Sequence, residues 1–321
     1  MILEVTNLSI RFPTRRGTLT GVDGITFSVA PGEVLGVVGE SGAGKSITGL
    51  GIIGLLEPPG RIAGGEVRLE GSRIDNLPHE RLRRIRGRRI GVVFQDPLTS
   101  LNPLYTIGRQ LEETIVTHLE LSQSAARERA LSLLREVGIP AAGERYHHYP
   151  HQFSGGMRQR VVIALAIAAE PVLLIADEPT TALDVSIQAQ VITLLKRLAK
   201  DRGTAVMLIT HDMGVIAETA DRVAVMYAGR IVEVGPVRDV IHSPQHPYTA
   251  GLMGSIPKIS SSERKQRLAQ IEGSMPRLNA IPAGCAFNPR CPKRFARCLD
   301  ARPDLMPAGS GLAACWLHEP A

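Results

Sequence analysis

The stretch Gly39-Glu40-Ser41-Gly42-Ala43-Gly44-Lys45-Ser46 decides the fold. It fits the pattern Gly-x₄-Gly-Lys-Ser/Thr and lies between a predicted buried strand, Val34–Val38, and a predicted helix, Ser46–Leu56. The glycines let the backbone curl so that successive N–H groups point at phosphate oxygens, and the helix start adds a partial positive charge. Lys45 would reach the β- and γ-phosphates, and the Ser46 hydroxyl would ligate Mg²⁺. The stretch therefore predicts a nucleoside triphosphate site in an α/β domain.

Two further motifs support a phosphate site. The apolar run Val172–Ala176 is a predicted strand that ends in Asp177 and Glu178. Asp177 would hold the metal, and Glu178 would polarise the water that attacks the γ-phosphate. Upstream, Ser154-Gly155-Gly156 precedes the predicted helix Arg158–Ala169 and would form a second anion site of N–H groups and a hydroxyl.

Hydrophobic periodicity predicts strands that alternate with helices, which indicates a mainly parallel sheet covered by helices. The residues from Leu111 to Val137 show a helical pattern, and Ala228-Gly229 is predicted to turn a closing hairpin. Val240–Pro257 contains three prolines and is predicted as a loop. The other predicted elements are the strands Ile2–Val5, Ile25–Val29 and Ala205–Thr210 and the helices Ile187–Leu198 and Met213–Ala220.

Composition divides the chain into two predicted domains, residues 1–255 and 256–321. A helical lobe is expected at about 100–155 within the first. The second has eight prolines and all four cysteines, and its ten Lys and Arg against five Asp and Glu carry most of the net charge of +6. A nearly neutral main domain and only 4% aromatic residues argue against a nucleic-acid partner. No apolar run is long enough to span a bilayer, and no secretion signal is recognised, so we expect a cytosolic chain.

The chain resembles the ATP-binding cassette (ABC) ATPases over residues 1 to about 240, because six motifs follow one another in that family's order. They are the Walker A motif at 39–46, the Q-loop glutamine Gln95, the signature Phe153-Ser154-Gly155-Gly156-Met157, Walker B with its glutamate at 172–178, the D-loop Ala182-Leu183-Asp184 and the switch histidine His211. The resemblance implies a RecA-like P-loop core with an antiparallel β subdomain and an inserted helical subdomain. It also implies ATP hydrolysis with Mg²⁺.

The resemblance assigns roles to individual residues. Glu178, His211 and Gln95 would be catalytic, with His211 on the γ-phosphate and Gln95 near the metal and the membrane partner. Mg²⁺ would be held by Ser46, Gln95 and Asp177. Phe12 stands where the family has an aromatic residue stacked on adenine, although a core phenylalanine is nearly as common. The expected nucleotide-binding residues are Phe12, Gly39, Ser41, Gly42, Ala43, Gly44, Lys45, Ser46, Ile47, Ser154, Gly155, Gly156, Asp177 and Asp184.

Such cassettes act as head-to-tail dimers, so Ser154–Gly156 would serve the partner's ATP. The signature has Phe153 and Met157 where Leu and Gln are usual, but its phosphate-facing residues are intact. The segments Gln95–Pro103 and His246-Pro247-Tyr248-Thr249 resemble the ATPase subunits of dipeptide, oligopeptide and nickel importers, above all the first ATPase subunit of a dipeptide importer. That branch implies peptide uptake by two paralogous ATPases beneath two integral membrane permeases, supplied by an extracytoplasmic binding protein. The chain would lie at the cytoplasmic face of the membrane, coupled through residues of about 95–110.

Other functions remain open at this point. The same family includes nickel and other small-solute importers. A soluble ABC ATPase acting on nucleic acid or ribosomes would need a long coiled-coil insertion or a second cassette, and neither is recognised. A regulatory protein in which ATP is secondary is disfavoured by the intact Glu178 and His211. The six arginines of Arg81–Arg89 are interpreted as a solvated surface rather than a nucleic-acid or lipid site.

The cysteines Cys285, Cys291, Cys298 and Cys315 cluster in the last 37 residues. They lack the Cys-x₂-Cys spacing of ordinary zinc sites, and two disulfides are disfavoured in the cytosol. Buried thiols would leave the clustering unexplained. The nearby cations Arg290, Lys293, Arg294 and Arg297 would offset the charge of a 4Fe–4S cluster. Some of the similar importer ATPases carry such a cluster in this region. We therefore expect a 4Fe–4S cluster, with zinc as the alternative, to hold the C-terminal segment folded.

Overall fold

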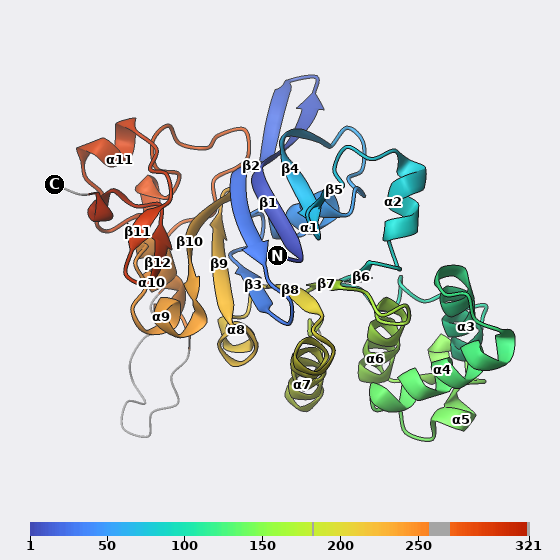
Figure 1. Cartoon of the computed structure of the whole chain (residues 1–321). Coiled ribbons are helices and arrows are strands. Elements are labelled where there is room, and N and C mark those ends of the chain that lie inside the picture. The colour runs from blue at the N-terminus through green and yellow to red at the C-terminus, as the bar shows by residue number, and fades with distance from the viewer. Residues whose placement is uncertain (182, 257–269, 320–321) are drawn as a thin grey trace, which may run out of the picture. The chain divides into compact units, whose positions relative to one another are not determined.

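The computed structural model describes residues 1–181, 183–256 and 270–319, and these form two compact units (Figure 1). The first unit comprises residues 1–3, 29–34 and 68–208. The second unit comprises residues 4–28, 35–67 and those from 209 onward. This division differs from the predicted domain boundary between residues 255 and 256, which stays a prediction.

The second unit holds strands of two sheets. In the smaller sheet, β1 (Leu3–Thr14) lies between β2 (Gly17–Val29) and β4 (Arg61–Leu69). The short strand β5 (Ser72–Arg73) belongs to the first unit. In the larger sheet, five neighbouring strands have the order β11-β12-β10-β9-β3. Their bounds are β3 (Val34–Val38), β9 (Arg222–Tyr227), β10 (Arg230–Pro236), β11 (Met306–Ala308) and β12 (Gly311–Ala313). β3 and β9 run parallel, and the other pairs are antiparallel.

The turn between β9 and β10 confirms the predicted hairpin. Ala228 and Gly229 have φ values of 47° and 80°. Positive φ at both central residues is the requirement of the tight turns that suit the twist of two antiparallel strands. Tyr227 pairs with Arg230 and Met226 with Ile231, and the register then shifts between Ile231 and Glu233.

Before residue 257, the described part of the second unit contains the helices α1 (Lys45–Ile52), α8 (Met213–Thr219), α9 (Val237–His242) and α10 (Pro247–Gly254). The last two show that the loop predicted for Val240–Pro257 is wrong. His246 caps α10, because its side chain accepts a hydrogen bond from the backbone N–H of Tyr248 at 3.0 Å. Pro247 occupies the first helical position, where its missing N–H costs nothing. One of the three prolines that indicated a loop, Pro247, therefore begins a helix, and Pro257 lies outside the described residues.

Residues 270–319, called here the C-terminal region, are part of the second unit and consist of short elements. They include η2 (Asn288–Arg290), α11 (Ala296–Asp300), the β11–β12 hairpin and η3 (Trp316–His318). β12 pairs with β10 through Glu233↔Ala313, and the ring of Phe287 packs against Tyr227 and Tyr248 at centroid distances of 5.3 and 5.4 Å. Backbone pairing and aromatic packing therefore hold this region in place.

The first unit contains the adjacent strands β8 (Ala205–Thr210), β7 (Leu173–Asp177) and β6 (Ile90–Val93), although the last two residues of β8 belong to the second unit. β6 and β7 run parallel, with Val93 opposite Ala176. The helical pattern of Leu111–Val137 resolves into two helices because Ser122 caps the second of them. The helices of this unit are α2 (His79–Ile85), α3 (Ile107–His118), α4 (Gln123–Glu136), α5 (Ala142–Arg145), η1 (Pro150–Gln152), α6 (Gly155–Ala166) and α7 (Val185–Arg202).

The core strands are buried along nearly their whole length. Every residue of β3 and β8 is buried, as are the first four of β7. Continuous burial of this kind is typical of parallel strands with helices over both faces. Within the described residues, no helix combines the length and the apolar character needed to cross a bilayer.

Candidate active site

The P-loop, residues 39–46, connects β3 to α1 in the second unit, as the sequence predicts. Gly39 and Gly44 have φ values of 157° and 101°. A Cβ on Gly39 would lie 2.2 Å from the carbonyl oxygen of Met226, and one on Gly44 would lie 2.8 Å from that of Gly21. Real Cβ atoms do not approach so closely, so the loop can follow this path only with glycine at both positions.

The lysine of the loop is folded back over it. The buried Lys45 ammonium donates to the carbonyl oxygens of Gly39 at 2.8 Å and of Glu40 at 3.1 Å. Glu40 is also held from outside the loop, since its backbone N–H donates to the hydroxyl of Tyr248 at 2.9 Å and its carboxylate pairs with Arg290 at 3.0 Å. The P-loop is therefore fixed by its own lysine and by residues far along the chain.

Other residues predicted to bind nucleotide lie around the P-loop. Ser41 and Gly42 are exposed, Ala43 is buried, and Ser46 and Ile47 are partly buried. Phe12 lies close by, because a Cβ built on Gly21 would meet its ring at 2.9 Å and the Ile47 side chain at 3.5 Å. This places Phe12 beside the first turn of α1, and its stacking on adenine stays a prediction.

His211 also belongs to the second unit and directly follows β8. It occupies an exposed position, and the next residue, Asp212, caps α8 by accepting from the N–H of Gly214 at 2.7 Å. The cap fixes the chain direction immediately after the histidine. The contact of His211 with a γ-phosphate stays a prediction.

In the first unit, parallel pairing of β6 with β7 brings the Q-loop glutamine to the Walker B glutamate. Gln95 Nε2 donates to Glu178 Oε2 at 3.0 Å, and the Thr181 hydroxyl donates to the same oxygen at 2.9 Å. Asp177 is the last residue of β7, and Glu178 follows it with a φ of 48°, in the left-handed region that non-glycine residues seldom adopt. Local strain of this kind is found where a side chain must be aimed.

The signature and the D-loop lie side by side in the same unit. The Ser154 hydroxyl caps α6, which begins at Gly155 rather than at the predicted Arg158, and Asp184 caps α7 through the N–H of Ile187 at 2.9 Å. That N–H and the Ser186 hydroxyl lower the pKa of Asp184. A Cβ on Gly156 would lie 2.5 Å from Ile187, so the two helix starts are in close contact. Ala182 lies outside the described residues.

The predicted metal cluster of the C-terminal region is wrong. Within residues 1–181, 183–256 and 270–319, no group of three or more His, Cys, Asp and Glu side chains is arranged to hold a metal ion. The four cysteines border a common cavity of only about 10 Å³, which is about the space of one water molecule. Burial raises the pKa of the Cys285 thiol to about 11 and also raises the pKa values of Cys291 and Cys315, so these groups are neutral thiols at pH 7.

Two of the four cations expected to balance a cluster are engaged elsewhere, whereas Lys293 borders the cysteine cavity. Arg290 pairs with Glu40 of the P-loop. Arg297 pairs with Glu319 and lies 3.9 Å above the Trp316 ring. The sequence did not predict that Glu40, Tyr248 and Arg290 hold the P-loop in place. The one available signal was His246-Pro247, a helix-start pattern that would have placed Tyr248 on a helix.

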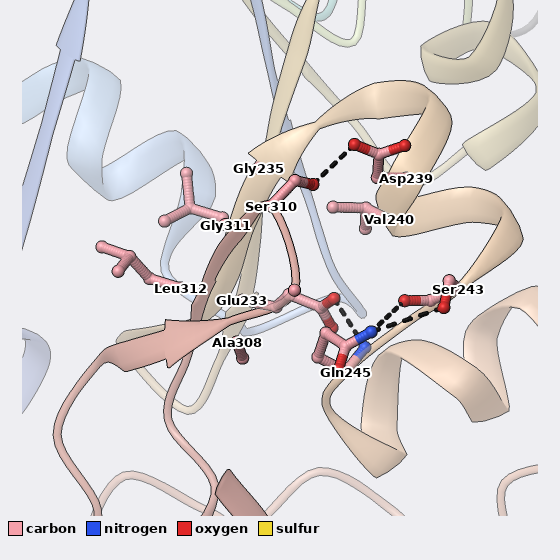
Figure 2. A pocket seen from close by; sticks show the side chains of 12 residues that line it. Glu233, Gly235, Asp239, Val240, Ser243, Gln245, Ala308, Ser310, Gly311 and Leu312 are labelled. Atoms are coloured by element: carbon pink, nitrogen blue, oxygen red, sulfur yellow. Dashed lines mark hydrogen bonds between the residues drawn. The ribbon is translucent and has the colours of Figure 1, made fainter.

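A separate cavity of about 290 Å³ lies in the second unit between α9 and the β11–β12 hairpin (Figure 2). Glu233 lines it and accepts hydrogen bonds from the backbone N–H groups of Gln245 and His246, both at 2.8 Å. Across the cavity, the Ser310 hydroxyl donates to Asp239 at 2.5 Å. The residues that line it include none of the predicted site residues of the described chain.

Comparisons with known proteins agree with these motifs. The family "ABC transporter" matches residues 22–181, and the family "Oligopeptide/dipeptide transporter, C-terminal region" matches residues 232–298. The chain is 47% identical over 320 residues to the dipeptide transport ATP-binding protein DppD of Bacillus subtilis, which covers 99% of this chain and 95% of that protein. It is 46% identical over 316 residues to the oligopeptide transport ATP-binding protein OppD of Salmonella typhimurium, covering 98% and 93%.

A solved structure gives the same result. The ATP-binding cassette MJ0796, in a dimeric post-hydrolysis state bound to ADP and Pi, matches with a TM-score of 0.66 and 30% identity over 74% of this chain and 99% of that one. The predicted α/β P-loop fold is therefore confirmed. Because the similarity to the curated relatives spans almost the entire chain, the protein belongs to the ABC transporter family of ATP-binding subunits.

Proposed function

We propose that this chain is the ATP-hydrolysing subunit of an importer for dipeptides or oligopeptides. The relatives that match 98–99% of the chain are named as dipeptide, oligopeptide or peptide import ATP-binding proteins. The observation that carries hydrolysis is the pair of hydrogen bonds by which Gln95 and Thr181 orient the Glu178 carboxylate. A carboxylate held in one orientation can act as the general base for a water molecule.

The P-loop is the proposed phosphate site. Residues Gly39 to Ile47 supply the backbone N–H groups of the loop and the start of α1, and Lys45 supplies the positive charge. Phe12, beside Ile47, would contact the adenine. His211, exposed at the end of β8, would contact the γ-phosphate.

Each residue predicted to hold Mg²⁺ offers an oxygen donor. Magnesium prefers oxygen ligands and in such enzymes uses one or two carboxylates together with phosphates. Ser46 offers a hydroxyl, Gln95 an amide oxygen and Asp177 a carboxylate, which is the donor set expected for this ion. When bound, Mg²⁺ neutralises charge on the phosphate oxygens. Glu178 would then take the proton of the attacking water.

We propose that the chain works as a head-to-tail dimer with a second, paralogous ATPase. Ser154, Gly155 and Asp184 are exposed on the first unit, and the neighbouring Val185 side chain is 83% exposed. This surface would complete the partner's nucleotide site, with Gly156 keeping the signature helix in contact with α7.

Permease subunits are the proposed membrane partners. Beyond Gln95 the chain exposes two large apolar side chains, Leu98 at 60% and Leu104 at 79%, and Phe94 just before it is 41% exposed. These side chains would dock on the permeases, and the chain would then lie at the cytoplasmic face of the membrane. An extracytoplasmic binding protein would deliver the peptide.

Transport by the reconstituted complex tests this function. The chain would be assembled in liposomes with a paralogous ATPase and two permeases of the same importer family, and the binding protein would be added outside. We expect ATP-dependent uptake of labelled dipeptide or oligopeptide. Uptake of Ni²⁺ with no uptake of peptide would reject the proposed substrate, and ATP-independent uptake would reject the proposed role.

A further inference from the structure

Glu40 is held at three points by the rest of the second unit. Its carboxylate accepts from Arg290, its backbone N–H donates to the Tyr248 hydroxyl, and its carbonyl oxygen accepts from Lys45. Two of these three partners lie more than 200 residues away in sequence. The C-terminal part of the chain therefore positions the backbone at the start of the P-loop.

Arg290 connects the C-terminal region to the loop. Its side chain is only 7% exposed, and its guanidinium donates to Glu40 at 3.0 Å, to the Tyr227 hydroxyl at 3.3 Å and to the carbonyl oxygen of Glu272 at 2.9 Å. It also lies 5.9 Å from the centre of the Phe287 ring. Burial lowers the pKa of this guanidinium, but the hydrogen bonds to Glu40 and Tyr227 outweigh that effect and leave the pKa raised.

Arg290 and Glu40 depend on their contact to different degrees. Arginine presents a rigid fork of donors and keeps its charge when buried, so its place requires a carboxylate. Glu40 does not require its partner in the same way, because its side chain is 27% exposed and water can solvate it. Without Arg290, however, an uncompensated negative charge would stand within the loop that has to bind the negatively charged phosphates.

We propose that Arg290 is a positioning residue for nucleotide binding, through which the C-terminal region sets the affinity of the P-loop for ATP. The inference rests on the proposed ATP site. Two effects act together. Arg290 neutralises Glu40, which removes repulsion of the phosphates. It also fixes the start of the loop, so less conformational freedom is lost when the nucleotide binds.

Titration of the full-length chain with a fluorescent ATP analogue and Mg²⁺ tests the proposal. Arg290→Gln should weaken binding about tenfold, which corresponds to about 1.4 kcal/mol. The double variant Arg290→Gln/Glu40→Gln should recover most of this loss because the uncompensated carboxylate is gone. Added salt should reduce the defect of Arg290→Gln, since salt screens repulsion between partly exposed charges.

Arg297→Gln is the matched control, because Arg297 lies in the same region but pairs with Glu319 away from the P-loop. It should bind the analogue like the unmodified chain. Equal affinities of Arg290→Gln and Arg297→Gln would overturn the proposal, as would a defect that the double variant and salt leave unchanged. If Arg290→Gln melts below the assay temperature, Arg290→Lys, which keeps the charge but loses the fork, must show an intermediate affinity.

The proposed ATP site is tested separately in the same titration. Lys45→Ala should abolish binding whatever residue 290 is. Binding that survives Lys45→Ala would reject the P-loop as the nucleotide site. Loss with Lys45→Ala but no effect of Arg290→Gln would reject only the positioning role.

Discussion

Gln95 and Glu178 are 83 residues apart in sequence, and their side chains meet in a 3.0 Å hydrogen bond. They meet because β6 and β7 pair in parallel, so that the residues following the two strands emerge at the same edge. Glu178 reaches this position with a left-handed backbone. The contact ties the segment proposed to touch the permeases to the proposed general base.

Replacement of this carboxylate should stop turnover but not binding. Glu178→Gln keeps the shape and the hydrogen bond to Thr181 but removes the base, so phosphate release by the assembled complex should fall by about 10²–10⁴-fold. Nucleotide affinity should stay within about threefold of the original value, because the P-loop is untouched. Glu170→Gln is the control, since Glu170 pairs with Arg129 on the surface and should leave turnover unchanged. Near-normal turnover by Glu178→Gln would show that another group is the base.

The isolated chain should hydrolyse ATP poorly. Its signature residues Ser154 and Gly155 are exposed on the first unit and, in the proposed dimer, act on the nucleotide of the partner. Addition of the second ATPase should raise phosphate release per chain, and the rise should depend on concentration as dimerisation does. Light scattering on the assayed samples would show whether the active protein is a monomer or a dimer. Full activity from a species proven to be monomeric would contradict the head-to-tail arrangement.

The C-terminal region should depend on strand pairing rather than on metal. The backbone N–H of Ala314 donates to the carbonyl oxygen of Val232 at 2.8 Å. Ala314→Pro removes this donor and should destabilise the region by about 2 kcal/mol, which limited proteolysis after residue 270 would detect. Ala314→Gly retains the donor and serves as the control. Equal protease resistance of the proline and glycine variants would contradict this role of β12.

The cysteines should behave as unliganded thiols. The purified chain, prepared without air, should be colourless near 400 nm, should contain no stoichiometric iron or zinc and should yield four titratable thiols after unfolding. Chelators should leave its melting temperature unchanged. Brown protein with about four irons per chain would contradict this prediction and show that the cysteines bind an iron–sulfur cluster.

His246 should make the fold sensitive to acid. Burial lowers the pKa of this histidine from 6.5 to about 3, so it stays neutral in the folded chain while the unfolded chain binds a proton below pH 6.5. Its stabilising contribution is therefore complete above pH 6.5 and is lost as the pH falls towards 3, by about 1.4 kcal/mol per pH unit.

His246→Asn provides the comparison. Asparagine also caps helices, so it can still accept from the N–H of Tyr248, but it does not titrate. Between pH 6.5 and pH 5, denaturant unfolding should show a flatter loss of stability for this variant than for the unmodified chain. Identical slopes would mean that His246 does not titrate on unfolding.

Sequence alone determined the nucleotide-binding motifs and the class of fold. Motifs such as the P-loop are contiguous, and their chemistry depends on local backbone freedom: Gly39 and Gly44 adopt conformations that only glycine tolerates at those distances from Met226 and Gly21. The apolar runs of β3, β7 and β8 likewise indicated buried parallel strands, because burial on both faces leaves no polar position. These features are encoded over a few neighbouring residues.

Only the tertiary structure decided which distant residues act on those motifs. No local pattern shows that Arg290 pairs with Glu40, because the contact depends on the register of β12 against β10 and on the packing of Phe287 against Tyr227. Clustered cysteines with nearby arginines predicted a metal site. In three dimensions the space between the thiols is about that of one water molecule, and Arg290, one of those arginines, pairs with Glu40 of the P-loop. Spacing along the chain specifies which groups are present, whereas packing fixes the volume between them and the partner each charge finds.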